Sequence, residues 1–230
     1  MNGAARVGET NRSSAALRLL TVLVCGTALV AAMIPSSALA NYYSIGSTST
    51  SGAGGGYAQA LIEDMYAPDC PSGGHTNQTL WTSTDNGAGW AEIGWARGFE
   101  GSCSLLYYWA YDNPADGYHE FSISTASIGS YHNFEVQEVY VGEYDVYRDG
   151  AKMGAVVGAQ PWTIWVEVGL EQTAAPGATD LVQTPWDWHE TRAEACCSWN
   201  WWSNGTTYND SGHSYVWTAT NPWIHAQVQR

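Results

Sequence analysis

Basic side chains are scarce in this sequence: Lys and Arg number eight, against 22 Asp and Glu, which gives a formal net charge of −14 at pH 7. A surface with so little positive charge is a poor match for nucleic acid or an anionic membrane, because both are recognised through clustered Lys and Arg. We therefore expect neither as a partner. Acidity of this kind is more simply typical of a secreted protein that stays soluble.

Long hydrophobic runs are also missing, and no apolar run reaches the roughly 20 residues that a membrane-spanning helix needs. The main run, residues 19–34, follows three arginines and is succeeded by Pro35 and a small-residue site ending at Ala40. This order is typical of a secretory signal peptide cleaved after Ala40. We therefore expect a secreted, extracellular protein whose mature part has no membrane segment.

Zinc-binding motifs are absent as well, because the sequence has no Cys-x-x-Cys pair and no His-Glu-x-x-His segment. No metal site or organic cofactor is therefore expected.

Beyond the signal peptide, an even number of cysteines predicts disulfides in an oxidising compartment. A bond between the adjacent Cys196 and Cys197 would be strained. We expect Cys103 to pair either with Cys70 or with one of these two.

Helix signals are weak, and short alternating aromatic runs separated by Gly, Asn and Asp take their place. Strands at roughly ten-residue spacing predict an all-β fold, a jelly-roll-like antiparallel β-sandwich that forms a single domain after the cleaved signal peptide. We assign residues 1–40 to the signal peptide, 41–56 to a Ser/Gly-rich N-terminal segment and 57–230 to the β-sandwich domain. Residues 46–56 are expected to form a loop or an irregular edge, with ordered structure beginning near Tyr57.

Two turn signals are sharp, and one segment is ambiguous. Asp-Asn-Gly at residues 85–87 and Asp-Gly at residues 149–150 each separate two alternating runs, which predicts two hairpins. The segment "YAQALIEDMY", residues 57–66, contains enough Ala, Leu, Met and Glu for a helix as an alternative to a strand.

The segment "WVEVGLE", residues 165–171, has two carboxylates four residues apart in an apolar run. Alternation in a strand puts its valines and leucine on one face and, on the other, Trp165, Glu167, Gly169 and Glu171. In "WAEIGWARG" the same kind of face carries Trp90, Glu92 and Gly94.

If both faces line one cleft, Glu92 and Glu171 meet there. Two nearby carboxylates in a partly desolvated cleft do not both ionise easily, so the pair holds one proton at acidic pH. One carboxylate can then activate water while the other donates a proton. The glycines would leave room for a substrate backbone. The simpler alternative is that both are solvated acids on an outer face.

These segments resemble the neprosin family of secreted glutamic peptidases. "WAEIGWARG" followed by "LLYYWAYDN" is similar to the family's Glu-x-Gly-Trp strand and the aromatic strand after it. "EVGLE" is similar to the family's Glu-x-Gly-Gly-Glu segment, with Leu170 in place of the second glycine. The resemblance implies a β-sandwich that cleaves polypeptides at acidic pH, with Glu92 and Glu171 as the catalytic pair. The neighbouring candidates for substrate binding are Trp90, Gly94, Trp165, Glu167 and Gly169.

A second group of residues favours a different function. It comprises Trp186, Trp188, Trp199, Trp201 and Trp202, with Asp187, His189 and Asn204. Exposed tryptophans beside Asn and Asp stack on sugar rings and bind their hydroxyls, although we expect most of these indoles to pack in the core. The alternative function is therefore a non-catalytic, lectin-like module that binds a polysaccharide. A third is a glycoside hydrolase, since paired carboxylates also cleave glycosidic bonds. We expect His189 and Glu190 to form a surface pair.

Overall fold

Strands make up most of the described structure, and all described residues belong to the compact unit Asn41–Arg230. The computed structural model describes residues 43–49, 54–67, 70, 74–83, 89–99, 102–157, 165–172, 184–192, 198–202, 205–209, 216–220 and 225–229. The expected signal peptide and the cysteines at positions 196 and 197 lie outside these residues. Within the described ranges, no helix has the length and apolarity to span a membrane.

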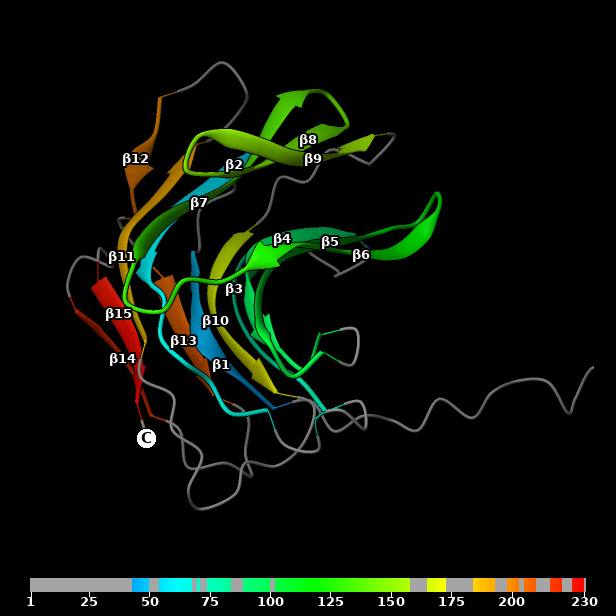
Figure 1. Ribbon diagram of the computed structural model, residues 1–230. Coiled ribbons are helices and arrows are strands. Elements are labelled where there is room, and N and C mark those ends of the chain that lie inside the picture. Colours follow the sequence, from blue (N-terminus) through cyan, green and yellow to red (C-terminus); the bar gives the residue numbers. More distant parts are fainter. Residues whose placement is uncertain are drawn as a thin grey trace, which may run out of the picture. The chain divides into compact units, whose positions relative to one another are not determined.

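The first sheet has seven strands in the order β13-β1-β10-β3-β4-β5-β6, and each neighbouring pair is antiparallel (Figure 1). Its strands are β13 (Gly205–Asn209), β1 (Tyr43–Ser49), β10 (Trp165–Gln172), β3 (Thr76–Ser83), β4 (Trp90–Arg97), β5 (Leu105–Asn113) and β6 (Gly117–Thr125). Strand β3 therefore separates the two segments that carry the paired glutamates.

The second sheet has the order β14-β15-β11-β2-β7-β8-β9, and β12 pairs with β11 outside this path. Its strands are β14 (Val216–Thr220), β15 (His225–Gln229), β11 (Thr184–Arg192), β2 (Gly55–Leu61), β7 (Tyr131–Tyr140), β8 (Glu143–Arg148), β9 (Ala151–Val157) and β12 (Asn200–Trp201). Its pairs are antiparallel too. The prediction of an all-β antiparallel sandwich is confirmed.

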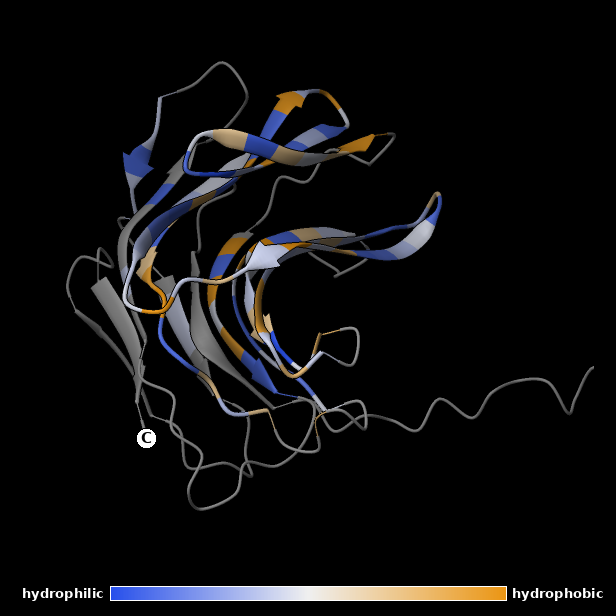
Figure 2. Cartoon of the chain, in the orientation of Figure 1, coloured by the Kyte–Doolittle hydropathy of each residue, from blue (hydrophilic) through white to orange (hydrophobic). Residues whose placement is uncertain are grey.

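The alternation of side chains along a strand explains which face of each strand packs in the core. In β10, Val166, Val168 and Leu170 are fully buried in the core, and in β4 the core residues are Ile93 and Trp95. Hydrophobic and hydrophilic residues accordingly alternate along the described strands (Figure 2). The faces predicted from the sequence for these two strands are confirmed.

Aromatic side chains join the two sheets. The ring of Trp95 in β4 stacks on Phe134 of β7 at a centroid distance of 5.7 Å and packs against Trp186 of β11 at 5.3 Å. Trp186 also donates its indole N–H to Oε1 of Gln78 in β3, at 3.1 Å. Each fully buried aromatic contributes roughly 1.5–3 kcal/mol or more through the hydrophobic effect, so these rings stabilise the sandwich strongly.

Both predicted hairpins connect adjacent strands. Asp149 and Gly150 between β8 and β9 have φ angles of 51° and 76°, and two successive residues of positive φ define a type I′ turn. Ser83 and Trp90 are Cα partners at the matching ends of β3 and β4. The Asp-Asn-Gly turn between them lies outside the described residues.

One local expectation was wrong, and the structure decides between the two alternatives for another segment. The backbone of residues 43–49 forms β1, which pairs with β10 and β13, and β2 already begins at Gly55. Ordered structure therefore begins before Tyr57, because pairing with two neighbouring strands stabilises an extended backbone in a segment whose Ser and Gly residues suggested a loop. The segment considered for a helix forms the end of β2 instead, and residues 62–67 are irregular.

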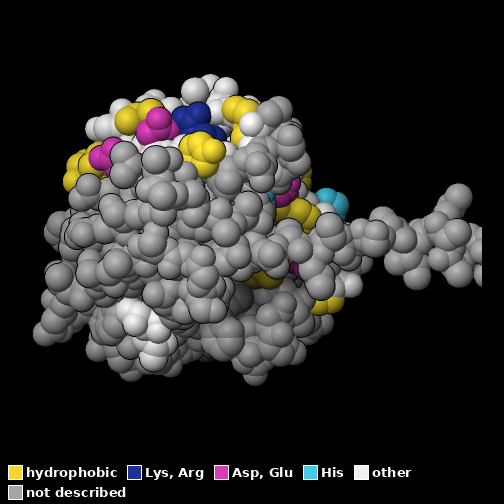
Figure 3. All heavy atoms as spheres, turned by 90° about the horizontal axis from the view of Figure 1, so that it is seen from below, with side chains coloured by type: hydrophobic (Ala, Val, Ile, Leu, Met, Phe, Trp, Pro, Cys, Tyr) yellow, Lys and Arg dark blue, Asp and Glu magenta, His cyan; other side chains and the backbone are white. Residues whose placement is uncertain are grey.

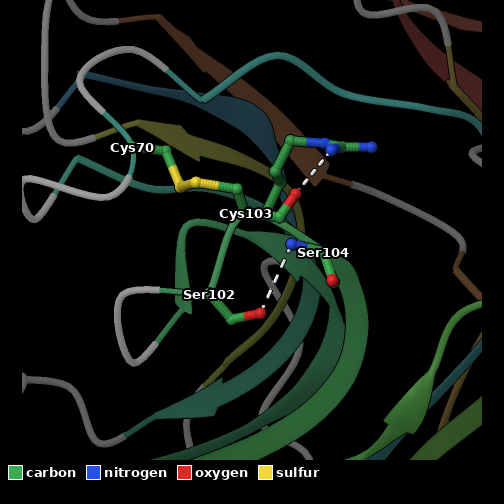
Figure 4. Close-up of a disulfide and its surroundings, with 5 residues drawn as sticks. Cys70, Ser102, Cys103 and Ser104 are labelled. Atoms are coloured by element: carbon green, nitrogen blue, oxygen red, sulfur yellow. Dashed lines mark hydrogen bonds between the residues drawn. A yellow bond between two sulfur atoms is a disulfide. The ribbon is translucent and has the colours of Figure 1, made fainter.

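Cys70 and Cys103 form a disulfide across a sequence separation of 33 residues, with Cα atoms 5.7 Å apart (Figure 4). This is one of the pairings that the sequence left open. Ser102 lies beside the bond and accepts a hydrogen bond from the Ser104 amide at 3.3 Å. The disulfide fastens the segment before β3 to the segment before β5.

Basic side chains in the described region lie beside acidic ones. The three basic residues whose side chains are described each contact an aspartate: Arg97 contacts Asp64, Arg148 lies 3.7 Å from Asp149, and Lys152 lies 2.6 Å from Asp145. The described part of the face in Figure 3 shows its Lys and Arg atoms as a small group near acidic side chains. No basic patch of the kind that nucleic acid requires is present on that part.

Candidate active site

Glu92 and Glu171 lie on the same face of the first sheet, opposite the core. On β4, Glu92 alternates with the buried core residues Ala91 and Ile93, and on β10 Glu171 follows the core residue Leu170. Since β3 pairs with both strands, the two glutamates belong to one continuous surface of the sheet. The two matched faces therefore belong to the same side of the sheet, while a cleft shared by the two carboxyl groups stays a prediction.

The register of the strands sets the positions of three acidic residues around Glu92. Its Cα partner on β3 is Trp81, whose partner on β10 is Glu167, so Glu92 and Glu167 are two strand spacings, about 10 Å, apart at the backbone. Glu171 lies four residues further along β10. On the other side, Ala110 of β5 separates Glu92 from Glu120 of β6.

Trp81 lies beside Glu92 on the neighbouring strand. It is 9% exposed, is the Cα partner of both Glu92 and Glu167, and hydrogen-bonds to Glu92. The backbone of Trp81 therefore lies between the backbones of these two acids. The charge of Glu171 acts on Glu92 from further along β10.

Glu92 is a buried acid whose pKa is raised by its surroundings. Its exposed fraction is 4%. Burial raises its pKa well above the ordinary value, and the charges of Glu171 and then Glu120 raise it further, while hydrogen bonds from Tyr108 and Trp81 partly oppose the shift. A carboxyl group in this setting is protonated where an exposed glutamate is already ionised.

Tyr108 and Asn77 connect Glu92 to Glu171. Asn77 of β3 donates from Nδ2 to the hydroxyl of Tyr108 on β5 at 2.8 Å, and Tyr108 hydrogen-bonds to Glu92. The other end of the same amide, Oδ1, accepts the backbone N–H of Glu171 at 3.1 Å. Because one lone pair of the tyrosine oxygen is used by Asn77, its hydrogen is free to point at Glu92.

Tyr108 is itself held in its neutral, donating form. It is 1% exposed, and burial followed by the charge of Glu92 raises the pKa of its hydroxyl well above the ordinary value. Glu92 Oε2, in contrast, has no hydrogen-bond partner among the described residues. One oxygen of the carboxyl is therefore held by protein donors, while the other is buried and makes no hydrogen bond within the described residues.

The residues predicted to bind substrate have different outcomes. Trp90 is half-buried on the Glu92 face and packs against Tyr118, with ring centroids 5.6 Å apart. Gly169 and Glu167 share the face of Glu171, whereas the Trp165 side chain lies outside the described part of the structure. The prediction that Gly94 leaves room for a substrate backbone has to be corrected, because a Cβ at this position would lie 1.9 Å from the Gln78 carbonyl oxygen. Its missing side chain accommodates the protein's own β3 backbone rather than a substrate.

The tryptophans considered for carbohydrate binding differ in how far they are buried. Trp186 and Trp202 are fully buried in the core, as expected for most of these indoles. Trp201 is 45% exposed, and Trp199 is half-buried. The side chains at positions 187–189 and 204 lie outside the described part of the structure. The expected surface pair of His189 and Glu190 therefore stays a prediction.

Sequence reasoning missed four residues that shape this site, namely Asn77, Trp81, Tyr108 and Glu120. The alternation of residues along each strand did not identify them as site residues, because their contacts with Glu92 and Glu171 come from pairing with neighbouring strands. Only the aromatic strand "LLYYWAYDN" carried a signal, since a tyrosine within it faces Glu92. Among the described residues, no group of three or more His, Cys, Asp or Glu side chains could hold a metal ion.

Comparison with known proteins supports the fold. No protein-family model and no curated protein sequence matches the chain. Among solved structures, Scytalido-glutamic peptidase with a peptide-based transition-state analogue superposes with a TM-score of 0.59 at 7% identity, covering 82% of this chain and 98% of that one. SCP-B, a member of the eqolisin family of peptidases in complex with the tripeptide Ala-Ile-His, gives 0.54 at 10% identity, covering 82% and 98%.

Structural neighbours of this protein are thus glutamic peptidases of the eqolisin family, and at such low identity the likeness establishes the shared β-sandwich. A Bacillus licheniformis β-glucanase reaches a TM-score of 0.41 at 14% identity, covering 82% of this chain and 78% of that one. That value is too low to carry an argument.

Proposed function

We propose that this protein is a secreted glutamic endopeptidase of the neprosin type that is active at acidic pH, with Glu92 as the acid and Glu171 as the base. The observation that carries the proposal is the buried Glu92, whose pKa is raised by desolvation and by the charge of Glu171. Such a pair supplies a proton donor and an acceptor on one surface at the same pH, which is what water-mediated hydrolysis requires.

In the proposed reaction, Glu171 removes a proton from water as the water oxygen attacks the carbonyl carbon of a peptide bond. Glu92 gives its proton to the carbonyl oxygen, and a gem-diol results. Glu171 then passes its proton to the amide nitrogen as the C–N bond breaks, while Glu92 recovers a proton from a diol hydroxyl. The products are a carboxylic acid and an amine, and both glutamates return to their starting states.

The structural neighbours add support, because they are peptidases bound to a peptide-based analogue and to a tripeptide. A polypeptide is accordingly the proposed substrate. Export to the extracellular space is proposed from the signal-like N-terminus, and the disulfide between Cys70 and Cys103 is typical of proteins that mature under oxidising conditions.

The decisive experiment is proteolysis of a reduced and alkylated protein substrate between pH 3 and pH 7 by the purified protein and its Glu→Gln variants. Glu92→Gln and Glu171→Gln should each lose roughly 10²- to 10⁴-fold in turnover while keeping the wild-type circular dichroism spectrum. Glu167→Gln should lose far less, since Trp81 separates Glu167 from Glu92. Glu143→Gln in β8 is the matched control on the other sheet and should be fully active.

Two outcomes would overturn the proposal. Full activity in both Glu92→Gln and Glu171→Gln would remove the catalytic pair. Absence of proteolysis across the pH range, together with retention on a polysaccharide column or release of sugars from a glucan, would favour the carbohydrate-binding or glycoside hydrolase alternatives.

A further inference from the structure

The second sheet carries a cavity of about 310 Å³ on the face turned away from the core. It is lined by Tyr57, Gln59, Glu135, Glu190 and Trp199. Tyr57 and Gln59 alternate along β2 with Ala58 and Ala60, which are fully buried in the core. The cavity is therefore separate from the Glu92 site, which lies on the other sheet.

Two aromatic rings form a corner of this cavity. The centroids of Tyr57 and Trp199 are 6.0 Å apart, and the ring planes are tilted by 53°. Trp199 precedes β12, which pairs with β11 through Glu190 and Thr191. A shift in register between Asp187 and Glu190 of β11 accompanies this arrangement. Irregularities of this kind redirect side chains near binding sites.

Two carboxylates flank the tyrosine. Glu190 on β11 and Glu135 on β7 are the Cα partners of Tyr57 on its two sides. Burial raises the pKa of Tyr57, and the charges of Glu190 and then Glu135 raise it further. Burial also raises the pKa of Glu190. The tyrosine hydroxyl thus lies in a region of negative potential, and none of the described residues that line the cavity is basic.

The remaining polar group also offers an acceptor. Gln59 donates from Nε2 to Oδ1 of Asn133 at 2.9 Å, so this bond uses a donor of the amide and leaves its acceptor oxygen out of that contact. A ligand for this site has to supply hydrogen-bond donors, positive charge and an apolar stem. Carboxylates bind such donors through charge-assisted hydrogen bonds, and aromatic faces attract cations.

We propose that this cavity binds the basic side chain of a polypeptide, an ammonium or guanidinium group on an aliphatic stem. The stem packs in the corner between Tyr57 and Trp199, and the charged end lies between Glu135 and Glu190. The volume is at the lower end of the range for ligand pockets, which suits one side chain. A neutral sugar ring is a poorer fit, because it would leave the charges of the two carboxylates without a positive partner.

The test is calorimetric titration at pH 7 with Nα-acetyl-lysine methylamide, Nα-acetyl-arginine methylamide and the neutral control Nα-acetyl-norleucine methylamide. At least one basic ligand should bind at least about tenfold more tightly than norleucine, and that preference should shrink in high salt. Glu135→Gln and Glu190→Gln should each weaken binding by about tenfold, and Trp199→Leu should weaken it too. Glu143→Gln is the matched control and should bind like the wild type.

Glu92→Gln separates this site from the proposed catalytic one, since it should abolish proteolysis and leave lysine and arginine binding unchanged. Equal binding of norleucine, absence of saturable binding by both basic ligands, or unchanged binding in both cavity glutamate variants would overturn the proposal. Tighter binding of a glucan oligosaccharide that is lost in Trp199→Leu would also overturn it, in favour of a sugar site.

Discussion

Asn77 and Tyr108 are joined by a hydrogen bond of 2.8 Å that passes over strand β4, since Asn77 belongs to β3 and Tyr108 to β5. Through this contact, one buried amide touches both halves of the candidate site. Its nitrogen orients the hydroxyl that hydrogen-bonds to Glu92, and its oxygen holds the backbone N–H of Glu171. The two acids are therefore positioned by the same side chain.

Removal of this amide should be costly. Asn77→Ala would leave the Glu171 N–H without its acceptor and would remove one of the hydrogen bonds of the Tyr108 hydroxyl, and an unsatisfied buried polar group costs about 1–3 kcal/mol. We expect the free energy of unfolding in urea to fall by that amount. Asn200→Ala is the control, because Asn200 is exposed and only donates to the Ser198 carbonyl, so its effect should stay within about 0.5 kcal/mol. Equal stability of the two variants would contradict the role of Asn77.

The raised pKa of Glu92 should make folding depend on pH. The folded state binds the proton more tightly than the unfolded chain, whose glutamates titrate near about 4.3, so stability is highest below that pH and falls as pH rises toward the folded pKa. The slope for one such group is at most about 1.4 kcal/mol per pH unit. Glu92→Gln should lose this slope in urea unfolding measured from pH 4 upward. Superimposable profiles for wild type and variant would contradict the assignment.

The charge of Glu171 should raise the pKa of Glu92, but it should not be the only cause of the raised pKa. In Glu171→Gln the Coulombic contribution disappears, so the pKa of Glu92 should fall, yet it should stay above the ordinary value because burial is the largest cause. Carboxyl ¹³C chemical shifts followed through a pH titration measure this directly. Glu143→Gln should leave the Glu92 titration unchanged. An unaltered Glu92 pKa in Glu171→Gln would mean that the two acids do not interact.

The disulfide should contribute substantially to stability. It closes a loop over a sequence separation of 33 residues, for which restriction of the unfolded chain predicts about 3–4 kcal/mol. Cys70→Ser combined with Cys103→Ser should lower the free energy of unfolding by about this amount, and reduction of the wild type should have the same effect. Ser102→Ala, beside the bond, should change stability little. An unchanged denaturation midpoint in the double variant would contradict this expectation.

Local sequence patterns were sufficient to predict several features of the structure. The alternation of Glu92 with Ala91 and Ile93, and of Glu171 with Leu170, predicted which face of each strand is buried, because side chains in a strand alternate with a period of two whatever the partner strand is. The positive φ angles at residues 149–150 likewise follow from Asp-Gly chemistry within the turn. Such features depend on residues adjacent in the chain.

Other features depended on distant neighbours. Residues 43–49 mix the strand formers Tyr43, Ile45 and Thr48 with Ser and Gly, and the pairing of this segment with β10 and β13 cannot be read from the segment itself. The same holds for Gly94, whose close approach to the Gln78 carbonyl exists only because β3 lies beside β4. Strand order is set by packing of the whole sandwich, so it leaves no local trace in the segments themselves.

By itself, the sequence determined that this protein is an antiparallel β-sandwich and that Glu92 shares its kind of face with Glu167 and Glu171. Only the tertiary structure brought the charge of Glu171 to act on Glu92. It places β3 between the two strands, with Trp81 beside Glu92, and it lets Asn77 and Tyr108 link Glu92 to the backbone of Glu171. The physical reason is that a pKa depends on burial and on charges nearby in space, and both are set by strands remote in sequence.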